Sequence, residues 1–243
     1  MPAFTVARLG PSWLCQPLMF TAGRTAAMLV LFACMAGPAP AHAPRRTGSL
    51  DLKAIVQAAQ REGGGALAVT QALLRDWPLK GSEFDKVLRV HRFFHEHLSF
   101  ASDQDVWHMR DDWAPPLQFF SQRQGDCEDF ALGKYVVLLS AGVPADRLRA
   151  VYVSVRSRAP QDDRHIVLAY DPAGLSGEPF IIDNLTPLIQ PASERTDLAM
   201  LEIVDIHQDD ALHARTGLSG RTKWLGTQMG HYAQASREEG FVF

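Results

Sequence analysis

The hydrophobic pattern of this chain changes its period at Gly142. Before that residue, apolar side chains recur at the spacing of a helix, most clearly after Ser82 and along 126–140. After it, apolar and polar residues alternate in short segments bounded by turn residues, which is the period of β-strands. Helices followed by strands predict an α+β fold in which helices pack on an antiparallel sheet.

Turn residues divide this pattern into expected elements. The expected helices are 50–60, 66–77, a longer helix capped by Ser82, and one that begins at Gly125 or Asp126 and ends at Ser140. The expected strands are 148–155, 165–170, 180–184 and 201–206. The segments predicted to be loops are 99–124, 157–164 and 171–179.

The first residues have the features of an export signal. Arg8 and Arg24 precede an apolar run at 26–36, and small residues follow it, so a signal peptide is predicted over 1–43. The apolar run is too short to predict a membrane span. We therefore expect an exported, periplasmic protein, with an uncleaved anchor or a lipoprotein signal ending at Cys34 as the alternatives.

The rest of the chain is predicted to form one domain. Residues 44–207 contain the patterned segments, and 208–243 form a tail that either docks as a short element around 223–225 or stays loose. The chain has 24 Lys and Arg against 27 Asp and Glu, and the basic residues are scattered. A nucleic-acid partner is therefore not expected.

Cys127 lies at the start of the helix predicted over 126–140, among the carboxylates of Asp126, Glu128 and Asp129. Backbone N–H groups and the helix dipole in a first turn lower the pKa of a thiol and stabilise a developing oxyanion. Neighbouring negative charge raises the pKa of a thiol instead. The segment therefore contains either an inert buried thiol or a nucleophile whose surrounding charge is offset.

The three carboxylates around the cysteine have two explanations. Asp126 suits the N-cap of a helix, and Glu128 and Asp129 are favoured in its first turn. A hard cation explains all three together, because carboxylates are preferred ligands of calcium and the bound charge would offset theirs. On the residues alone, both explanations stay open.

A cysteine nucleophile needs a base, and the base needs a group that orients it. His165 opens one predicted strand and Asp183 ends the next, so adjacent antiparallel strands would bring the two side by side. The alternatives are a solvent-facing histidine and an aspartate that begins a turn. His91 and His95 have the spacing of a zinc pair, but without an evident third ligand we expect core and surface histidines.

Several of these segments together resemble a known family. The segments 112–119 (DWAPPLQF), 125–131 (GDCEDFA), 142–144 (GVP), 165–168 (HIVL) and 182–185 (IDNL) are similar to those of the bacterial transglutaminase-like cysteine proteinases, most of all the LapG-type periplasmic proteases. This resemblance implies a papain/transglutaminase-like core. It also implies a cysteine endopeptidase with a Cys-His-Asp triad, in which Cys127 is the nucleophile, His165 the base and Asp183 its orienting group.

The resemblance further implies a cofactor, a substrate and a partner. Proteases of this type depend on Ca2+, and the acidic ligands map onto Asp126, Glu128 and Asp129. The implied substrate is the N-terminal region of a large secreted adhesin, whose cleavage controls biofilm attachment and dispersal. The implied inhibitory partner is an inner-membrane cyclic di-GMP receptor of the LapD type. Two alternatives remain: a transglutaminase-like acyltransferase or amidase that uses the same triad, and a non-catalytic binding module on this fold.

Overall fold

A computed structural model of the protein describes residues 46–106, 113–157, 164–173, 177–204 and 220–243. The predicted signal peptide lies outside these residues. The helices are α1 (Leu52–Glu62), α2 (Ala66–Leu74), α3 (Glu83–His97), α4 (Asp103–Val106), α5 (Pro116–Gln122), α6 (Cys127–Ser140) and α8 (Gly220–Glu238), with the 3-10 helices η1 (Ala145–Arg147) and η2 (Ala192–Glu194). Among the described helices, none combines the length and apolar composition needed to cross a bilayer.

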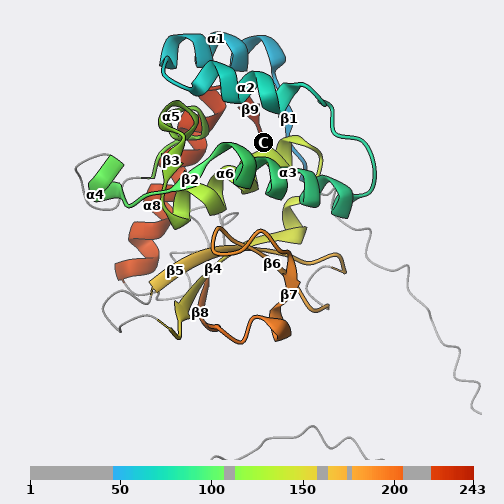
Figure 1. The fold of residues 1–243 in the computed structure, drawn as a ribbon, viewed down its shortest axis with the longest axis vertical. Coiled ribbons are helices and arrows are strands. Elements are labelled where there is room, and N and C mark those ends of the chain that lie inside the picture. The colour runs from blue at the N-terminus through green and yellow to red at the C-terminus, as the bar shows by residue number, and fades with distance from the viewer. Residues whose placement is uncertain (1–45, 107–112, 158–163, 174–176, 205–219) are drawn as a thin grey trace, which may run out of the picture. The chain divides into compact units, whose positions relative to one another are not determined.

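The strands form one main sheet and two short pairs (Figure 1). The main sheet has the order β7-β6-β5-β4-β8, and its strands are β4 (Leu148–Val155), β5 (Arg164–Tyr170), β6 (Phe180–Ile182), β7 (Gln190–Pro191) and β8 (Leu198–Val204). Its neighbouring strands are all antiparallel. The short pairs are β1 (Ser49–Leu50) with β9 (Phe241–Val242), and β2 (Ser99–Phe100) with β3 (Gln124–Gly125).

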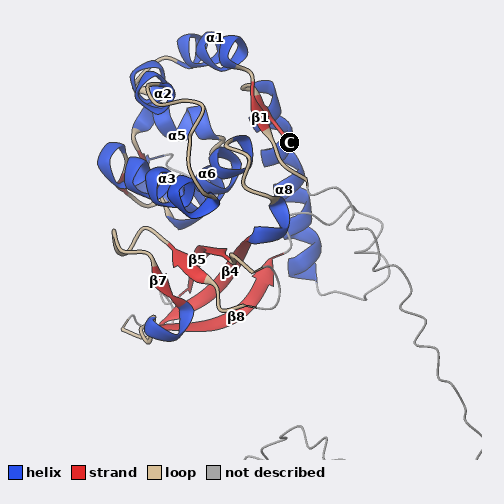
Figure 2. Ribbon diagram, turned by 90° about the vertical axis from the view of Figure 1, so that its right-hand side faces the viewer, coloured by secondary structure: helices blue, strands red, loops and turns tan. Residues whose placement is uncertain are grey.

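Helix α6 is the centre of the fold. Every residue from Asp129 to Ser140 is buried, because α3 and α5 pack against this helix on one side and β4 and β5 on the other. Figure 2 shows α3 and α6 together on one side of the main sheet. A helix that is apolar on all sides belongs in a core. The position of the start of α6 is therefore fixed by the elements packed around this helix as well as by the residues of its first turn.

The predicted α+β fold class is confirmed, with shifts at the ends of the predicted elements. The capping box of α3 forms between Ser82 and Asp85, as a helix capped by Ser82 requires. The second helix ends at Leu74 rather than Trp77, and the last sheet strand begins at Leu198 rather than Leu201. The end predicted for that strand, 205–206, lies outside the described residues.

The prediction of a loop over 99–124 is wrong. The segment contains β2, α4, α5 and β3. Pro116 is the first residue of α5, where a proline without an N–H loses no helical hydrogen bond. Phe119 and Phe120 bury their rings completely against the other helices. The two prolines favoured a loop in the sequence, whereas in the structure they open a short helix.

The C-terminal residues are more ordered than a short element around 223–225. The helix α8 extends over Gly220–Glu238, and β9 then pairs with β1 near the start of the described chain. Tyr232 and Phe241 are buried in the main core. Apolar residues are sparse in this segment and lie among polar ones, so its periodicity did not reveal the helix.

Candidate active site

The start of α6 is fixed by a capping box of two aspartates. Asp126 is extended, and its carboxylate accepts the N–H of Glu128 at 3.2 Å. Asp129 reaches back and accepts the N–H of Asp126 at 3.3 Å. Gly125 leaves room for this contact, because a Cβ there would collide with the Asp129 carboxylate and lie 2.8 Å from the ring of Phe119. The capping explanation of Asp126 and Asp129 is therefore correct in the structure.

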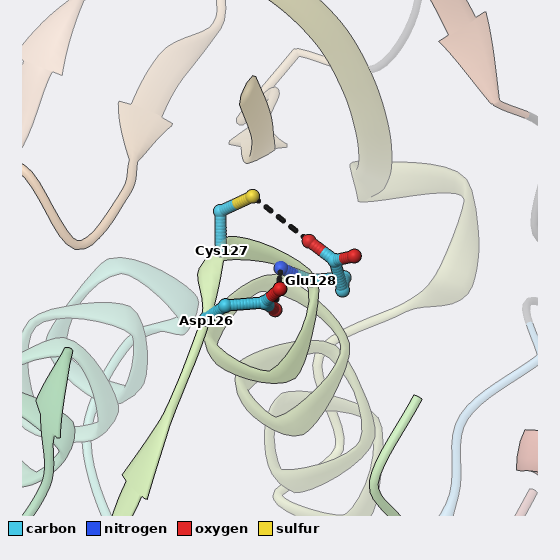
Figure 3. Close-up of side chains that lie close together, drawn as sticks. All are labelled: Asp126, Cys127 and Glu128. Carbon is cyan, nitrogen blue, oxygen red and sulfur yellow. Dashed lines mark hydrogen bonds between the residues drawn. The ribbon is translucent and has the colours of Figure 1, made fainter. Parts of the chain in front are cut away.

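Cys127 is the first residue of α6 and is partly buried. Its thiol donates a 2.8 Å hydrogen bond to a carboxylate oxygen of Glu128, and Figure 3 shows both side chains on the same side of the helix start. Burial raises the pKa of the thiol well above its usual value, and the charges of Glu128 and Asp126 raise it further. A hydrogen bond from the N–H of Ile166 lowers it in part. The thiol therefore reaches β5 beside His165.

His165 and Asp183 lie close together, as adjacent strands predicted. The imidazole Nε2 is 3.9 Å from a carboxylate oxygen of Asp183, and both side chains are almost completely buried. Alternation along β5 puts His165 on the same face of the sheet as Val167, and Asp183 continues the face of Ile181 on β6. Sheet register therefore explains why the histidine and the aspartate meet.

Asp183 also makes an ion pair that the sequence did not reveal. A guanidinium nitrogen of Arg195 lies 2.7 Å from the carboxylate oxygen that faces His165. Arg195 is buried and also makes two hydrogen bonds to the carboxylate of Asp197, at 2.8 and 2.9 Å. Arg195 follows η2 in a polar stretch, and nothing in its local sequence distinguishes it from a surface arginine. Only the folding of the chain brings it to Asp183.

The acidic residues divide into two overlapping sets. Carboxylate oxygens of Asp103, Asp126 and Asp129 lie within 4.8 Å of one another, and the same limit joins atoms of Asp126, Cys127 and Glu128. The three carboxylates expected to act together are thus split, because Glu128 turns toward the thiol while Asp129 caps the helix. Asp103, buried at the start of α4, is the residue that sequence reasoning missed.

The electrostatics of this cluster favour a cation. Burial raises the pKa of Asp126 to about 10, and the charges of Glu128 and Asp103 contribute to the rise. Burial and the charges of Asp126 and Asp103 also raise the pKa of Asp129 well above its usual value. Hard oxygen ligands confined together in this way suit calcium, whose charge would remove their mutual repulsion. The carboxylates of Asp103, Asp126 and Asp129 could therefore hold a calcium ion while Asp126 and Asp129 also cap the helix.

The two histidines considered as a zinc pair lie on α3, away from both acidic sets. Their rings are 4.5 Å apart and meet edge to face. His91 is buried, and burial lowers its pKa to about 3, so it is neutral at physiological pH. The potential metal groups among the described residues include neither His91 nor His95.

Comparisons with known proteins identify the family of this chain. The family described as bacterial transglutaminase-like cysteine proteinase matches residues 67–203, which include Cys127, His165 and Asp183. No protein in the curated set matches the sequence.

Solved structures of LapG from Legionella pneumophila are similar in fold and sequence. One is 28% identical over 75% of this chain and 99% of the other, with a TM-score of 0.59. A calcium-bound form is 31% identical over 63% and 82% of the two chains, with a TM-score of 0.54. An EGTA-treated form is 30% identical over 64% and 82%, with a TM-score of 0.55. The expected α+β, transglutaminase-like architecture is thereby confirmed.

Proposed function

The chain belongs to the bacterial transglutaminase-like cysteine proteinases, and on that basis we propose that it is a calcium-dependent endopeptidase with Cys127, His165 and Asp183 as its triad. The observation that carries this proposal is the buried pair of His165 and Asp183 on the strands next to a cysteine that begins a helix. That arrangement supplies a nucleophile, a base and an orienting carboxylate from three elements of one core.

The positions of the His165 and Asp183 side chains support these proposed roles. Nε2 of His165 faces Asp183, so we assign Nδ1 as the ring nitrogen that would accept the thiol proton. His165 accepts the thiol proton as the sulfur of Cys127 attacks the scissile carbonyl carbon. N–H groups at the start of α6 stabilise the oxyanion that forms. The 3.9 Å separation of His165 and Asp183 is longer than a hydrogen bond, and catalytic contacts commonly shorten when substrate binds.

Collapse of the tetrahedral intermediate completes the first half of the reaction. The C–N bond breaks, the leaving amine takes the proton from His165, and the N-terminal part of the substrate stays attached to Cys127 as a thioester. Water then gives a proton to His165 and attacks the thioester carbonyl. The C–S bond breaks, the thiolate of Cys127 takes the proton back from His165, and the acid product is released.

Asp103, Asp126 and Asp129 would hold calcium, with Glu128 next to them as a further oxygen donor. The bound ion would supply positive charge that offsets the carboxylates around the thiol. The support for calcium is the donor set itself and the similarity to a protein solved in calcium-bound form. Residues of this chain carry every chemical step, and a bound ion would only offset the charge around them.

The substrate that we propose is the N-terminal region of a large surface adhesin, and its cleavage would release cells from a biofilm. We further propose that the protein acts in the periplasm and is inhibited there by an inner-membrane cyclic di-GMP receptor of the LapD type. The similarity to LapG and the signal-like residues 1–43 support these proposals.

Cleavage of an adhesin fragment tests the function. The purified protein is incubated with the N-terminal fragment of a large adhesin from the same organism, in calcium or in EGTA, and products are identified by mass spectrometry. We expect discrete cleavage in calcium, none in EGTA, and none with Cys127→Ala. Cleavage by Cys127→Ala, or equal cleavage in EGTA, would contradict the proposal. Incorporation of a labelled amine without peptide cleavage would favour acyl transfer instead.

A further inference from the structure

Lys134 is completely buried inside the protein. It lies on α6 seven residues after Cys127, two helical turns along the same face. Lysine is rarely buried to this extent unless it is paired, because its charge is costly to remove from water. Burial lowers the pKa of Lys134 to about 7, which reflects that cost. A lysine at this position therefore needs an explanation other than core packing.

The contacts of Lys134 point to the proposed triad. Its Nζ donates a 2.9 Å hydrogen bond to the backbone carbonyl of Asp183. The same nitrogen lies over the rings of Phe130 and Phe94, 5.4 and 5.9 Å from their centroids. These aromatic faces accommodate a cation, although His91 and His95 also lie close enough to interact with its charge. The polar contact is thus directed at the main chain of the residue proposed to orient the base.

A second side chain supports the same carbonyl. His95 on α3 has its Nε2 3.1 Å from the oxygen of Asp183, so two helices hold this one peptide group. The Asp183 side chain is fixed separately, because one carboxylate oxygen accepts the N–H groups of Leu185 and Thr186. The other faces Arg195 and His165. The main chain at Asp183 is therefore tied to the helices, while its carboxylate is directed toward the histidine.

We propose that Lys134 is a positioning residue that ties the backbone of Asp183 to the helix that carries Cys127. One helix then holds the nucleophile at its start and the support of the orienting carboxylate two turns later. This inference rests on the proposed triad. A shift of about 1 Å in such a support is enough to cost up to about 100-fold in rate, even when the residue never touches substrate.

Substitution of Lys134 by methionine distinguishes a role in positioning Asp183 from a role in packing the core. Methionine keeps the unbranched shape and removes the charge and the donor. Replacing a buried charge with an apolar side chain of similar volume is often neutral or stabilising. We expect Lys134→Met to melt at the same temperature as the wild type or higher, with kcat/KM lowered about tenfold or more. A purely structural lysine would give the opposite result, a lower melting temperature with activity lost in proportion.

Lys86→Met is the matched control. The Nζ of Lys86 also donates to a backbone carbonyl, that of Ala141 at 2.7 Å, but at the far end of α6 from Cys127. We expect Lys86→Met to keep the kcat/KM of the wild type. Equal losses of activity in Lys86→Met and Lys134→Met would overturn the positioning role. A melting temperature that falls in Lys134→Met together with its activity would overturn it too.

Two further variants keep the inference testable if Lys134→Met does not fold. His95→Phe removes the other group on the Asp183 carbonyl and keeps an aromatic ring, and we expect it to lower kcat/KM by at least threefold. In an Asp183→Ala background, Lys134→Met and His95→Phe should each change the activity less than twofold, because both act through Asp183. Full activity of His95→Phe, or losses that simply add in this background, would overturn the inference.

The rate at which iodoacetamide alkylates Cys127 in calcium distinguishes this inference from the proposed function. An intact triad would raise the rate of this reaction by favouring the thiolate, and the reaction needs no adhesin. If the wild type alkylates quickly and cleaves no adhesin, the substrate proposal fails. Slower alkylation in Lys134→Met than in Lys86→Met then still supports the positioning role, and equal rates overturn it.

Discussion

The thiol of Cys127 donates a 2.8 Å hydrogen bond to the carboxylate of Glu128, the next residue in the chain (Figure 3). This contact holds the sulfur as a protonated thiol, because a neighbouring negative charge opposes formation of the thiolate. The cysteine and its acidic neighbours therefore form one electrostatic unit. A change that offsets the negative charge of the carboxylates should therefore also make the thiol more reactive.

Glu128→Gln should make the thiol more reactive when calcium is absent. Glutamine removes the negative charge next to the sulfur, and each 1.4 kcal/mol of lost repulsion is worth about tenfold in thiolate population. In EGTA, we expect iodoacetamide to alkylate Cys127 several-fold faster in this variant than in the wild type. Glu96→Gln, at an exposed position on α3, should match the wild type. Equal rates in all three proteins would show that Glu128 does not restrain the thiol.

Asp103→Asn should weaken calcium binding about tenfold or more, as measured by isothermal titration calorimetry. Asp103 is buried with its carboxylate next to those of Asp126 and Asp129. Asp105→Asn on the same short helix is the control, because Asp105 is exposed and its carboxylate accepts the hydroxyl of Ser102. If both variants bind calcium as the wild type does, Asp103 is not a ligand.

Arg195→Gln should destabilise the fold. The change leaves the buried Asp183 carboxylate without its 2.7 Å ion pair, and breaking a buried pair on one side costs about 3–5 kcal/mol. We expect the melting temperature to fall by about 6–20 °C. Adding Asp183→Asn should recover part of this loss, since the uncompensated charge disappears with it. A double variant that is less stable than Arg195→Gln would contradict this explanation.

Asp197→Asn tests the second carboxylate that is bound to Arg195. The Asp197 side chain is 45% exposed, so its bonds to Arg195 are screened by water. We expect the free energy of unfolding to fall by about 1 kcal/mol or less in this variant. A larger loss than that of Arg195→Gln would mean that Asp197, rather than Asp183, is the important partner of the arginine.

Glu239→Gln should stabilise the protein in a pH-dependent way. Glu239 follows α8 and accepts the N–H of Leu117 at 3.1 Å, and burial raises its pKa from 4.5 to about 8. The folded state therefore holds the proton more tightly than the unfolded state, and wild-type stability falls as the pH rises from 4.5 to 8. The gain in melting temperature of the variant should be near zero at pH 4.5 and largest above pH 8. A gain that does not change with pH would contradict this assignment.

The parts of the site formed by neighbours in the chain could be predicted from the sequence. The capping box of Asp126 and Asp129 depends on spacing within one helical turn, and the pairing of His165 with Asp183 depends on consecutive strands. Both features have local signals. Arg195 has none, because its ion pair with Asp183 forms only when the segment after β7 folds back over the sheet face.

Asp103 and the helix α8 could not be predicted because both depend on contacts between residues far apart in the chain. Asp103 joins Asp126 because β2 and β3 pair in parallel, and a two-residue pair leaves no periodic pattern. The helix α8 is held by contacts of scattered side chains such as Tyr232, so its amphipathic face is weak in the sequence. The main helices and sheet strands between 50 and 204 follow from periodicity, whereas the contacts between elements far apart in the chain depend on the complete fold.

The most direct test of the central claim is a search for the covalent intermediate on Cys127. The protein is mixed with an adhesin N-terminal fragment in calcium, quenched in acid within the first turnover, and digested for mass spectrometry. The proposed chemistry predicts a thioester that joins the N-terminal cleavage product to the sulfur of Cys127, in the wild type and not in Cys127→Ala. Adhesin cleavage that proceeds without this adduct, and at the same rate in Cys127→Ala, would contradict the claim.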